Sequence, residues 1–263
     1  MKLENIDNGN EFNWGKTSSD YSKFRDIYPD SMYRKLFSRG IGLKGQKILD
    51  MGTGTGVFPR AMYKYGAEFT GIDISEEQIE CAKKLREAQN MDIVFKACSA
   101  ESTGLNSNEY DIITSVQSFI YFDKEKITPE IKRLLKKDGK VVIIWMAWLP
   151  DECKIAEETE RLVLKYNPEW TGSGYKRSHN NFLNFLPEIL ETEEIINYTE
   201  ALEFNYELWT GRIRACRGVS ASLPEPVVND FNRDHMKMVK EITDEPFRIM
   251  HEINIGIYKM KRY

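Results

Sequence analysis

An apolar run that breaks into alternating glycines constrains this chain more than any other feature. The stretch KILDMGTGTGVFPRAM, residues 47–62, passes from a strand pattern into glycines at 52, 54 and 56 and then into a helix pattern. Glycines at such a turn allow backbone angles and close approaches that other residues forbid. The sequence therefore predicts a ligand site where the first strand ends. A glycine-rich turn that binds nothing is the alternative.

The residues around this turn alternate between strand and helix patterns. We predict strands at residues 47–51, 67–74, 92–97, 110–116 and 140–148. We predict helices at residues 57–66, 75–90 and 129–139, closed by Gly66 and Gly139 where a glycine follows the helix. Strands separated by helices indicate an α/β fold with a doubly wound, mostly parallel sheet. Ligands of such sheets bind beyond the carboxyl ends of the strands, near the point where the strand order reverses.

The rest of the chain adds to this core. Residues 1–44 are predicted to form an N-terminal helical lid, and residues 45–150 the cofactor-binding Rossmann-like core. Residues 151–195 read as a helical insertion with breaks at Pro168 and Pro187. Residues 196–263 read as strands near 196–208 and 247–261 with a helix near 225–243 between them, which completes a seven-stranded sheet.

Composition narrows the class of protein. The net charge of -4 argues against a general nucleic-acid binder, which needs a basic face. The four cysteines form no CxxC pair, and the three histidines have no metal-binding spacing, so we expect reduced thiols and no metal site. The N-terminus lacks a signal-peptide pattern, and the longest apolar run, residues 141–149, is too short to span a bilayer. We expect a soluble, cytoplasmic protein.

The glycine spacing separates two classes of nucleotide-binding protein. A dinucleotide fingerprint needs a third glycine at a position that Val57 or Pro59 occupies here. The pattern present is D-x-G-x-G-x-G, and it resembles motif I of the class I S-adenosylmethionine-dependent methyltransferases. The resemblance implies that the glycine backbone passes close to the methionine part of that cofactor. The motif residues are Asp50, Gly52, Gly54 and Gly56.

Two further segments match the same family at the expected intervals. Asp73 ends the second predicted strand, where the family uses an acid to accept hydrogen bonds from the ribose hydroxyls. Its neighbour Ile74 would then pack on the adenine. After the third strand, Ser99, Ala100 and Glu101 match a segment that lies beside the adenine in the small-molecule branch. Ser99 replaces the acidic residue usual there.

The run SVQSFIYFD, residues 115–123, follows the fourth strand. In relatives this run lies beside the methionine portion and the methyl-transfer point, so Gln117 is a candidate polar contact and Tyr121 a candidate wall of the acceptor site. Core packing is the alternative for the aromatic residues. No [DN]-P-P-[YFW] tetrapeptide occurs, which argues against methylation of exocyclic amines on nucleic-acid bases.

The N-terminal spacing of Trp14, Tyr21 and Arg25 is similar to the lid of trans-aconitate methyltransferase-like enzymes. That similarity implies that Tyr21 and Arg25 approach the cofactor carboxylate and that Trp14 borders the substrate. A surface role is the alternative for Arg25.

Two arginines and a tryptophan complete the substrate candidates. Arg214 and Arg217 would project together from a helix and bind a carboxylate or phosphate, or else pair with acids of this chain. Trp148 is a candidate wall of the acceptor site.

The resemblance implies a methyltransferase that moves a methyl group in line from S-adenosylmethionine to a small molecule and leaves S-adenosylhomocysteine. An anionic acceptor is one candidate, and no general base is identified. Three alternatives stay open: an oxidoreductase, a non-catalytic scaffold or sensor that binds S-adenosylmethionine, and an RNA methyltransferase.

Overall fold

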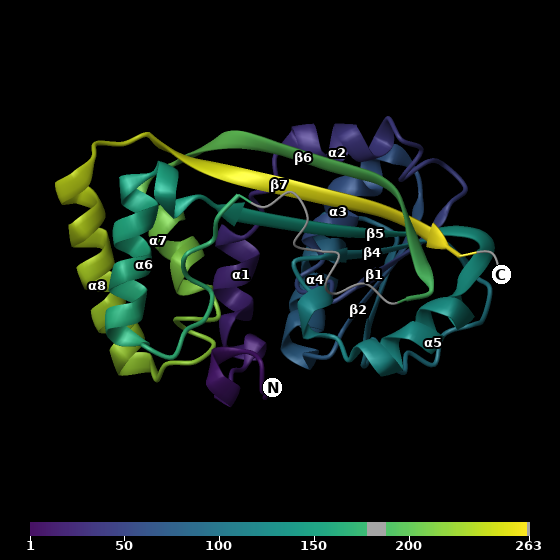
Figure 1. The fold of residues 1–263 in the computed structure, drawn as a ribbon, viewed down its shortest axis with the longest axis horizontal. Coiled ribbons are helices and arrows are strands. Elements are labelled where there is room, and N and C mark those ends of the chain that lie inside the picture. Colours follow the sequence, from purple (N-terminus) through teal and green to yellow (C-terminus); the bar gives the residue numbers. More distant parts are fainter. Residues whose placement is uncertain (178–187, 262–263) are drawn as a thin grey trace. The chain divides into compact units, whose positions relative to one another are not determined.

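The computed structural model describes residues 1–177 and 188–261. Seven strands form one sheet in the order β3-β2-β1-β4-β5-β7-β6 (Figure 1). They are β1 (Lys47–Met51), β2 (Glu68–Asp73), β3 (Ile93–Ala97), β4 (Tyr110–Val116), β5 (Leu135–Trp148), β6 (Leu190–Phe204) and β7 (Phe247–Met260). The predicted α/β class with a seven-stranded, mostly parallel sheet is confirmed.

The first five strands pair in parallel, and their order reverses between β1 and β4. Asp50 on β1 lies level with Gly71 on β2 and with Thr114 on β4. Asp73 on β2 lies level with Ala97 on β3, and Val116 on β4 with Ile144 on β5. The carboxyl ends of these strands therefore meet at one edge of the sheet, with the reversal beside the glycine turn.

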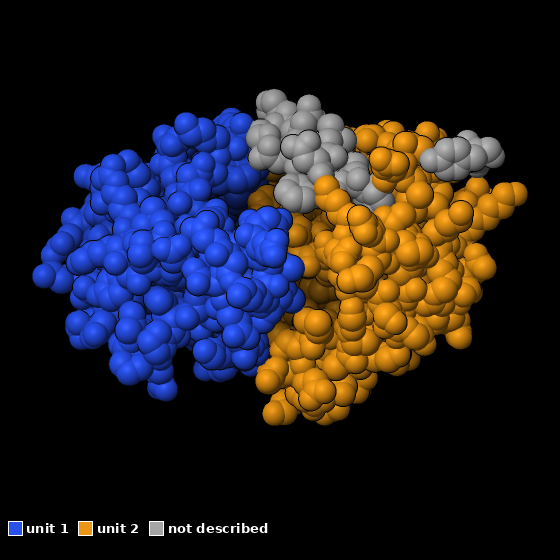
Figure 2. All heavy atoms as spheres, turned by 60° about the horizontal axis from the view of Figure 1, so that its bottom comes forward, with its two compact units in different colours: residues 1–27, 147–177, 199–252 blue, residues 28–146, 178–198, 253–263 orange. Residues whose placement is uncertain are grey.

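Contacts between residues group the chain into two compact units, which Figure 2 colours separately. Unit 1 contains residues 1–27, 147–177 and 199–252, and unit 2 contains residues 28–146, 178–198 and 253–263. The helices of unit 1 are α1 (Ser18–Phe24), α6 (Lys154–Tyr166), α7 (Tyr206–Arg214) and α8 (Glu225–Ile242). Apolar residues of α6, α7 and α8, among them Trp209 and Phe231, form one buried cluster.

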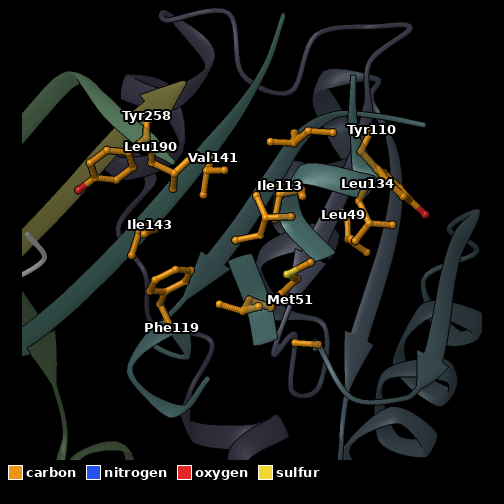
Figure 3. Close-up of a cluster of buried hydrophobic side chains, with 14 of the residues drawn as sticks. Leu49, Met51, Tyr110, Ile113, Phe119, Leu134, Val141, Ile143, Leu190 and Tyr258 are labelled. Carbon is orange, nitrogen blue, oxygen red and sulfur yellow. The ribbon is translucent and has the colours of Figure 1, made fainter. Parts of the chain in front are cut away.

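Unit 2 carries the glycine turn. Its helices are α2 (Asp30–Phe37), α3 (Val57–Met62), α4 (Glu76–Ala88) and α5 (Lys124–Leu134). Helix α5 packs Ile127 and Ile131 into a buried cluster with Ile143 of β5 and Tyr258 of β7, part of which Figure 3 shows. Helices α3 and α4 contact β2. Because parallel crossovers are right-handed, these two helices cover the face opposite α5.

The helix predicted at residues 129–139 begins and ends earlier, so that prediction was wrong in its bounds. Asp123 accepts hydrogen bonds from the N–H groups of Glu125 and Lys126, which starts α5 at Lys124. Pro129 therefore lies inside the helix instead of at its first position. Leu135 pairs with Tyr110 of β4, so the segment that ends in Gly139 belongs to strand β5.

The insertion predicted to be helical is only partly so. Helix α6 ends at Tyr166, just before Pro168, and turns follow it up to residue 177. Pro187 lies outside the described residues. Strand β6 begins at Leu190, within the range predicted to be helical, and its early part is rich in glutamate. Glutamate favours helices in isolation, which obscured the strand pattern.

Candidate functional site

The glycine turn joins β1 to α3 in a backbone conformation that suits glycine alone. The φ angles are +68° at Gly52, +56° at Gly54 and +75° at Gly56. A Cβ at Gly52 would lie 2.4 Å from the Cβ of Ser118, and one at Gly56 would lie 2.4 Å from the ring of Phe95. The left-handed angles favour glycine at all three positions, and close packing leaves no room for a side chain at Gly52 and Gly56.

Asp50 supports this turn from inside the protein. Its carboxylate is buried and accepts hydrogen bonds of 2.6 Å from the hydroxyls of Thr53 in the turn and Thr114 on β4. Burial raises the pKa of Asp50 to about 7, although both hydroxyls oppose the shift. Asp50 therefore positions the turn, and its role toward a cofactor stays a prediction.

Asp73 connects the end of β2 to the same turn. One carboxylate oxygen accepts a hydrogen bond from the N–H of Gly54, and the other accepts one from the N–H of Ser75, both at 2.9 Å. Burial raises the pKa of this carboxyl. The Ile74 N–H is a third backbone donor to this carboxylate. A carboxylate has about four acceptor sites, so the group can still accept a hydrogen bond from a ligand.

Ile74 follows Asp73 and is 61 % exposed, which is unusual for a large aliphatic side chain. An exposed isoleucine beside a partly buried carboxylate provides an apolar surface next to a polar contact. This combination suits a ligand with a flat apolar ring and a hydroxylated portion.

The segment after β3 connects to the start of α5. The Ser99 hydroxyl donates a hydrogen bond to Glu101, whose other oxygen accepts one from the Asp123 N–H at 3.0 Å. Ala100 between them is buried in the apolar cluster. These contacts therefore hold Ser99, Ala100 and Glu101 in place at the carboxyl edge of β3 and β4.

Gln117 follows β4 with φ of +62°, in the left-handed region that residues other than glycine seldom adopt. Its N–H donates to the Ile144 carbonyl at 2.9 Å, and its side-chain amide nitrogen donates to the Met146 carbonyl. Because a carbonyl can only accept, this contact fixes which end of the amide is the oxygen. Tyr121 lies in the short helix Phe119–Tyr121 that follows, partly buried.

The remaining predicted residues belong to unit 1. The Arg25 guanidinium lies 5.1 Å from the centre of the Tyr21 ring and donates to the Cys216 sulfur at 3.5 Å. Trp14 packs edge-on against Phe12. Their roles toward a cofactor or substrate stay predictions.

The two arginines predicted as anion ligands hold acids of their own unit. Arg214 donates to both carboxylate oxygens of Asp20 at 2.6 and 2.7 Å, and Arg217 lies 2.7 Å from the carboxylate of Asp7. Helix α7 ends at Arg214, so Arg217 does not project from it, and that prediction was wrong. Trp148 donates its indole N–H to buried Glu160 at 2.7 Å.

Several residues of the site escaped the sequence analysis. Thr114, Ser118 and Phe95 shape the turn through contacts between distant parts of the chain, which no local pattern signals. Thr53 shapes it through its hydrogen bond to Asp50. Within residues 1–177 and 188–261, no group of three or more His, Cys, Asp or Glu side chains could hold a metal ion. In the same part of the chain, no helix has the length and apolar character needed to cross a membrane.

A parallel sheet with a reversal beside a D-x-G-x-G-x-G turn, and an acid at the end of the neighbouring strand, defines a class I S-adenosylmethionine-dependent methyltransferase fold. Comparison with known proteins agrees: residues 49–143 match the family described as "Methyltransferase domain". This part of the chain is similar to that family over the strands and the glycine turn that form the site.

Individual proteins support the same assignment. The chain is 32 % identical over 108 residues to the ubiquinone biosynthesis O-methyltransferase of Coxiella burnetii, a match that covers 41 % of this chain and 46 % of that protein. The corresponding enzyme of Actinobacillus pleuropneumoniae is 35 % identical over 104 residues, with 37 % and 44 % covered. The chain thus spans less than half the length of these curated relatives.

Solved structures share the fold at low sequence identity. The YcgJ protein from Bacillus subtilis has a TM-score of 0.56 at 18 % identity, with 89 % of this chain and 100 % of that chain covered. Geranyl diphosphate C-methyltransferase from Streptomyces coelicolor, solved with S-adenosyl-L-homocysteine, has a TM-score of 0.50 at 15 % identity, with 88 % and 76 % covered.

Proposed function

We propose that the whole protein is an active methyltransferase that transfers the methyl group of S-adenosylmethionine to a small molecule. The observation that carries the proposal is the pair of hydrogen bonds by which Asp73 holds both Gly54 and Ser75. A partly buried carboxylate that fixes the glycine turn and retains acceptor capacity fits a ribose with two hydroxyls.

Different residues are assigned to different parts of the cofactor. Asp73 accepts hydrogen bonds from the ribose hydroxyls, and exposed Ile74 covers one face of the adenine. Ser99, Ala100 and Glu101 border the adenine, where the Ser99 hydroxyl is already engaged by Glu101. The backbone of Gly52, Gly54 and Gly56 passes the methionine portion, together with Gln117. Tyr21 and Arg25 are our candidates for the cofactor carboxylate.

The protein's part in the reaction is positioning. When bound, S-adenosylmethionine supplies a methyl group on a positively charged sulfur, which needs no further activation. The residues of the site hold the acceptor atom in line with that methyl group and exclude water. Correct orientation of two reactants can lower a barrier by roughly 7–11 kcal/mol. Trp14, Tyr121 and Trp148 are candidate walls for the acceptor.

The arginine contacts bear on the acceptor. Arg214 and Arg217, the two candidate anion ligands, each hold a carboxylate of this chain. An anionic acceptor would have to displace Asp20 or Asp7 to bind them. This engagement favours an uncharged acceptor over a carboxylate or phosphate.

The proposal is tested by methyl transfer from labelled S-adenosylmethionine. Purified protein is incubated with this donor and with either the small-molecule fraction or the RNA fraction of a cell lysate. We expect label in a small-molecule product with the wild-type protein and much less with Asp73→Ala. Label in RNA would contradict the small-molecule assignment. Binding of S-adenosylhomocysteine without transfer to either fraction would indicate a non-catalytic scaffold and overturn the proposal.

A further inference from the structure

A cavity on unit 2 takes no part in the proposed function. Its volume is about 470 Å³, within the range of pockets that bind small molecules. Side chains from three segments line it: residues 28–33 at the start of α2, residues 60–64 at the end of α3 and just after it, and Met91 between α4 and β3. All of these residues belong to unit 2. The fold thus brings distant parts of the chain together around one hollow.

The cavity lies at the edge of the sheet opposite the glycine turn. Helix α3 starts at the carboxyl end of β1 and leads to the amino end of β2. Arg60 and Ala61 lie in the second half of α3, and Tyr63 and Lys64 follow it. Met91 precedes the amino end of β3. Ligands of such sheets bind at the carboxyl edge, so a molecule in this cavity would be a second ligand.

Three tyrosines line the cavity. Tyr33 is buried, and the centre of its ring lies 6.2 Å from that of Phe58. The Tyr63 hydroxyl accepts a hydrogen bond from the Asp92 N–H at 3.0 Å, which holds this side chain against the loop before β3. Tyr28 is the third tyrosine of the wall. Aromatic side chains that are held in place offer flat apolar faces, which suit a flat aromatic ligand.

The charged side chains of the wall do not balance. Arg60 is only 6 % exposed, and its guanidinium donates to the side-chain oxygen of Gln89 at 3.3 Å. Lys64 is exposed and lies 3.1 Å from the carboxylate of Asp30, and their hydrogen bond lowers the pKa of Asp30. Two cations and one ionised carboxylate leave the wall with a net positive charge. Because Arg60 is buried, water and salt screen its charge weakly, so it attracts an anion.

We propose that this cavity is a second ligand site, which binds a flat aromatic molecule that carries one carboxylate. The ring packs among the three tyrosines, and the carboxylate binds the Arg60 guanidinium, which can donate two parallel hydrogen bonds to it. The single net charge of the wall matches a carboxylate better than a phosphate, which carries close to two negative charges at pH 7. The inference is independent of the proposed function, since it uses none of the candidate cofactor or acceptor residues.

The alternative is that the cavity binds nothing and that Arg60 only supports the fold. Two variants separate these roles: Arg60→Gln removes the cation, and Ala61→Trp fills the cavity without a change of charge. Arg86→Gln is the matched control. Arg86 is also partly buried and donates to the Ile93 carbonyl at 2.9 Å, but it is not among the described residues that line the cavity.

Four probes test the ligand class by protein-observed NMR: 2-naphthoate, 2-naphthyl phosphate, 2-naphthalenemethanol and acetate. We expect 2-naphthoate to bind the wild type and Arg86→Gln more tightly than the other probes do, and to shift the amide signals of Ala61, Lys64 and Met91. Its affinity should fall roughly ten- to a hundredfold in Arg60→Gln, and binding should be lost in Ala61→Trp. Added S-adenosylhomocysteine should not displace it.

Several results would overturn the inference. They are tightest binding of another probe, unchanged affinity for 2-naphthoate in Arg60→Gln or Ala61→Trp, its displacement by S-adenosylhomocysteine, and no binding of 2-naphthoate to the wild type. If Arg60→Gln does not fold, Ala61→Trp and the order of the four probes decide. Failure of the wild type to bind S-adenosylhomocysteine would instead count against the proposed function, and 2-naphthoate would still report on the cavity.

Discussion

The carboxylate of Asp73 accepts a hydrogen bond from the backbone N–H of Gly54 at 2.9 Å, and so joins the end of the second strand to the turn that follows the first. The two residues stand 19 positions apart in the chain. One side chain thus shapes the glycine turn and presents acceptor oxygens beside it. Damage to Asp73 should therefore change cofactor binding and the local fold together.

The crowding at Gly52 predicts a specific loss of stability. Gly52→Ala introduces both left-handed strain, roughly 1–2 kcal/mol, and overpacking against Ser118, roughly 1–3 kcal/mol. Gly45→Ala is the matched control, because its φ is +88° and nothing lies within 4 Å of the added Cβ. Urea unfolding should show the larger loss for Gly52→Ala, and calorimetry should show weaker S-adenosylhomocysteine binding only there. Equal losses of unfolding free energy in the two variants would mean that Ser118 moves away from the added Cβ without a cost in stability.

The buried acid at the strand reversal predicts a pH dependence. The pKa of Asp50 is about 7 in the folded protein, against an ordinary value of 3.8. The folded state therefore binds the proton more tightly than the unfolded state between these pH values. The contribution of the Asp50 carboxyl to the free energy of unfolding is largest at low pH. It falls by up to about 4 kcal/mol as the pH rises from about 4 to about 7.

Asp50→Asn removes this titration. Urea unfolding of the wild type and the variant at pH 5 and pH 7.5 isolates the contribution of the Asp50 carboxyl to the free energy of unfolding, because the two proteins share all other titratable groups. We expect the wild type to lose more stability than Asp50→Asn between the two pH values. If the free energy of unfolding changed equally in both proteins between the two pH values, the pKa of Asp50 would be near its ordinary value.

The arginine contacts predict structural roles in unit 1. Arg217→Gln leaves the carboxylate of Asp7, which is 2 % exposed, without its cation. Breaking a buried pair typically costs about 3–5 kcal/mol, whereas Arg161→Gln, at an exposed position of α6, should cost less than roughly 1 kcal/mol. Thermal unfolding measures both, and S-adenosylhomocysteine affinity should be unchanged in each. An unaltered melting temperature for Arg217→Gln would contradict the structural role.

Sequence patterns located the core strands because burial on both faces of the sheet leaves long apolar runs. Strands β1 and β4 have the predicted bounds, and β2 and β3 differ by a residue or so. The patterns misplaced α5 because Pro129 was interpreted as the start of a helix that Asp123 in fact caps. They missed the start of β6 because its glutamates suit a solvated helix as well as a partly exposed strand.

The resemblance to the methyltransferase family predicted the glycines and Asp73 as site candidates, and these roles stay predictions. It could not predict the contacts that the residues make. The contact of Asp50 with Thr114 spans 64 positions, and the left-handed backbone of Gln117 accompanies its hydrogen bonds to β5. Asn254 and Tyr258 of β7 have the spacing of one side of an alternating strand, and only the fold shows that both are buried.

The most direct test of the central claim is a calorimetric titration of S-adenosylhomocysteine into the wild type, Asp73→Ala and the surface control Glu80→Ala. Charge-assisted hydrogen bonds contribute roughly 1.5–3 kcal/mol, so Asp73→Ala should bind about ten- to a hundredfold more weakly, while Glu80→Ala matches the wild type. Circular dichroism confirms that each sample is folded at the assay temperature. A folded wild type that binds no S-adenosylhomocysteine, or a folded Asp73→Ala that binds it with unchanged affinity, would contradict the account.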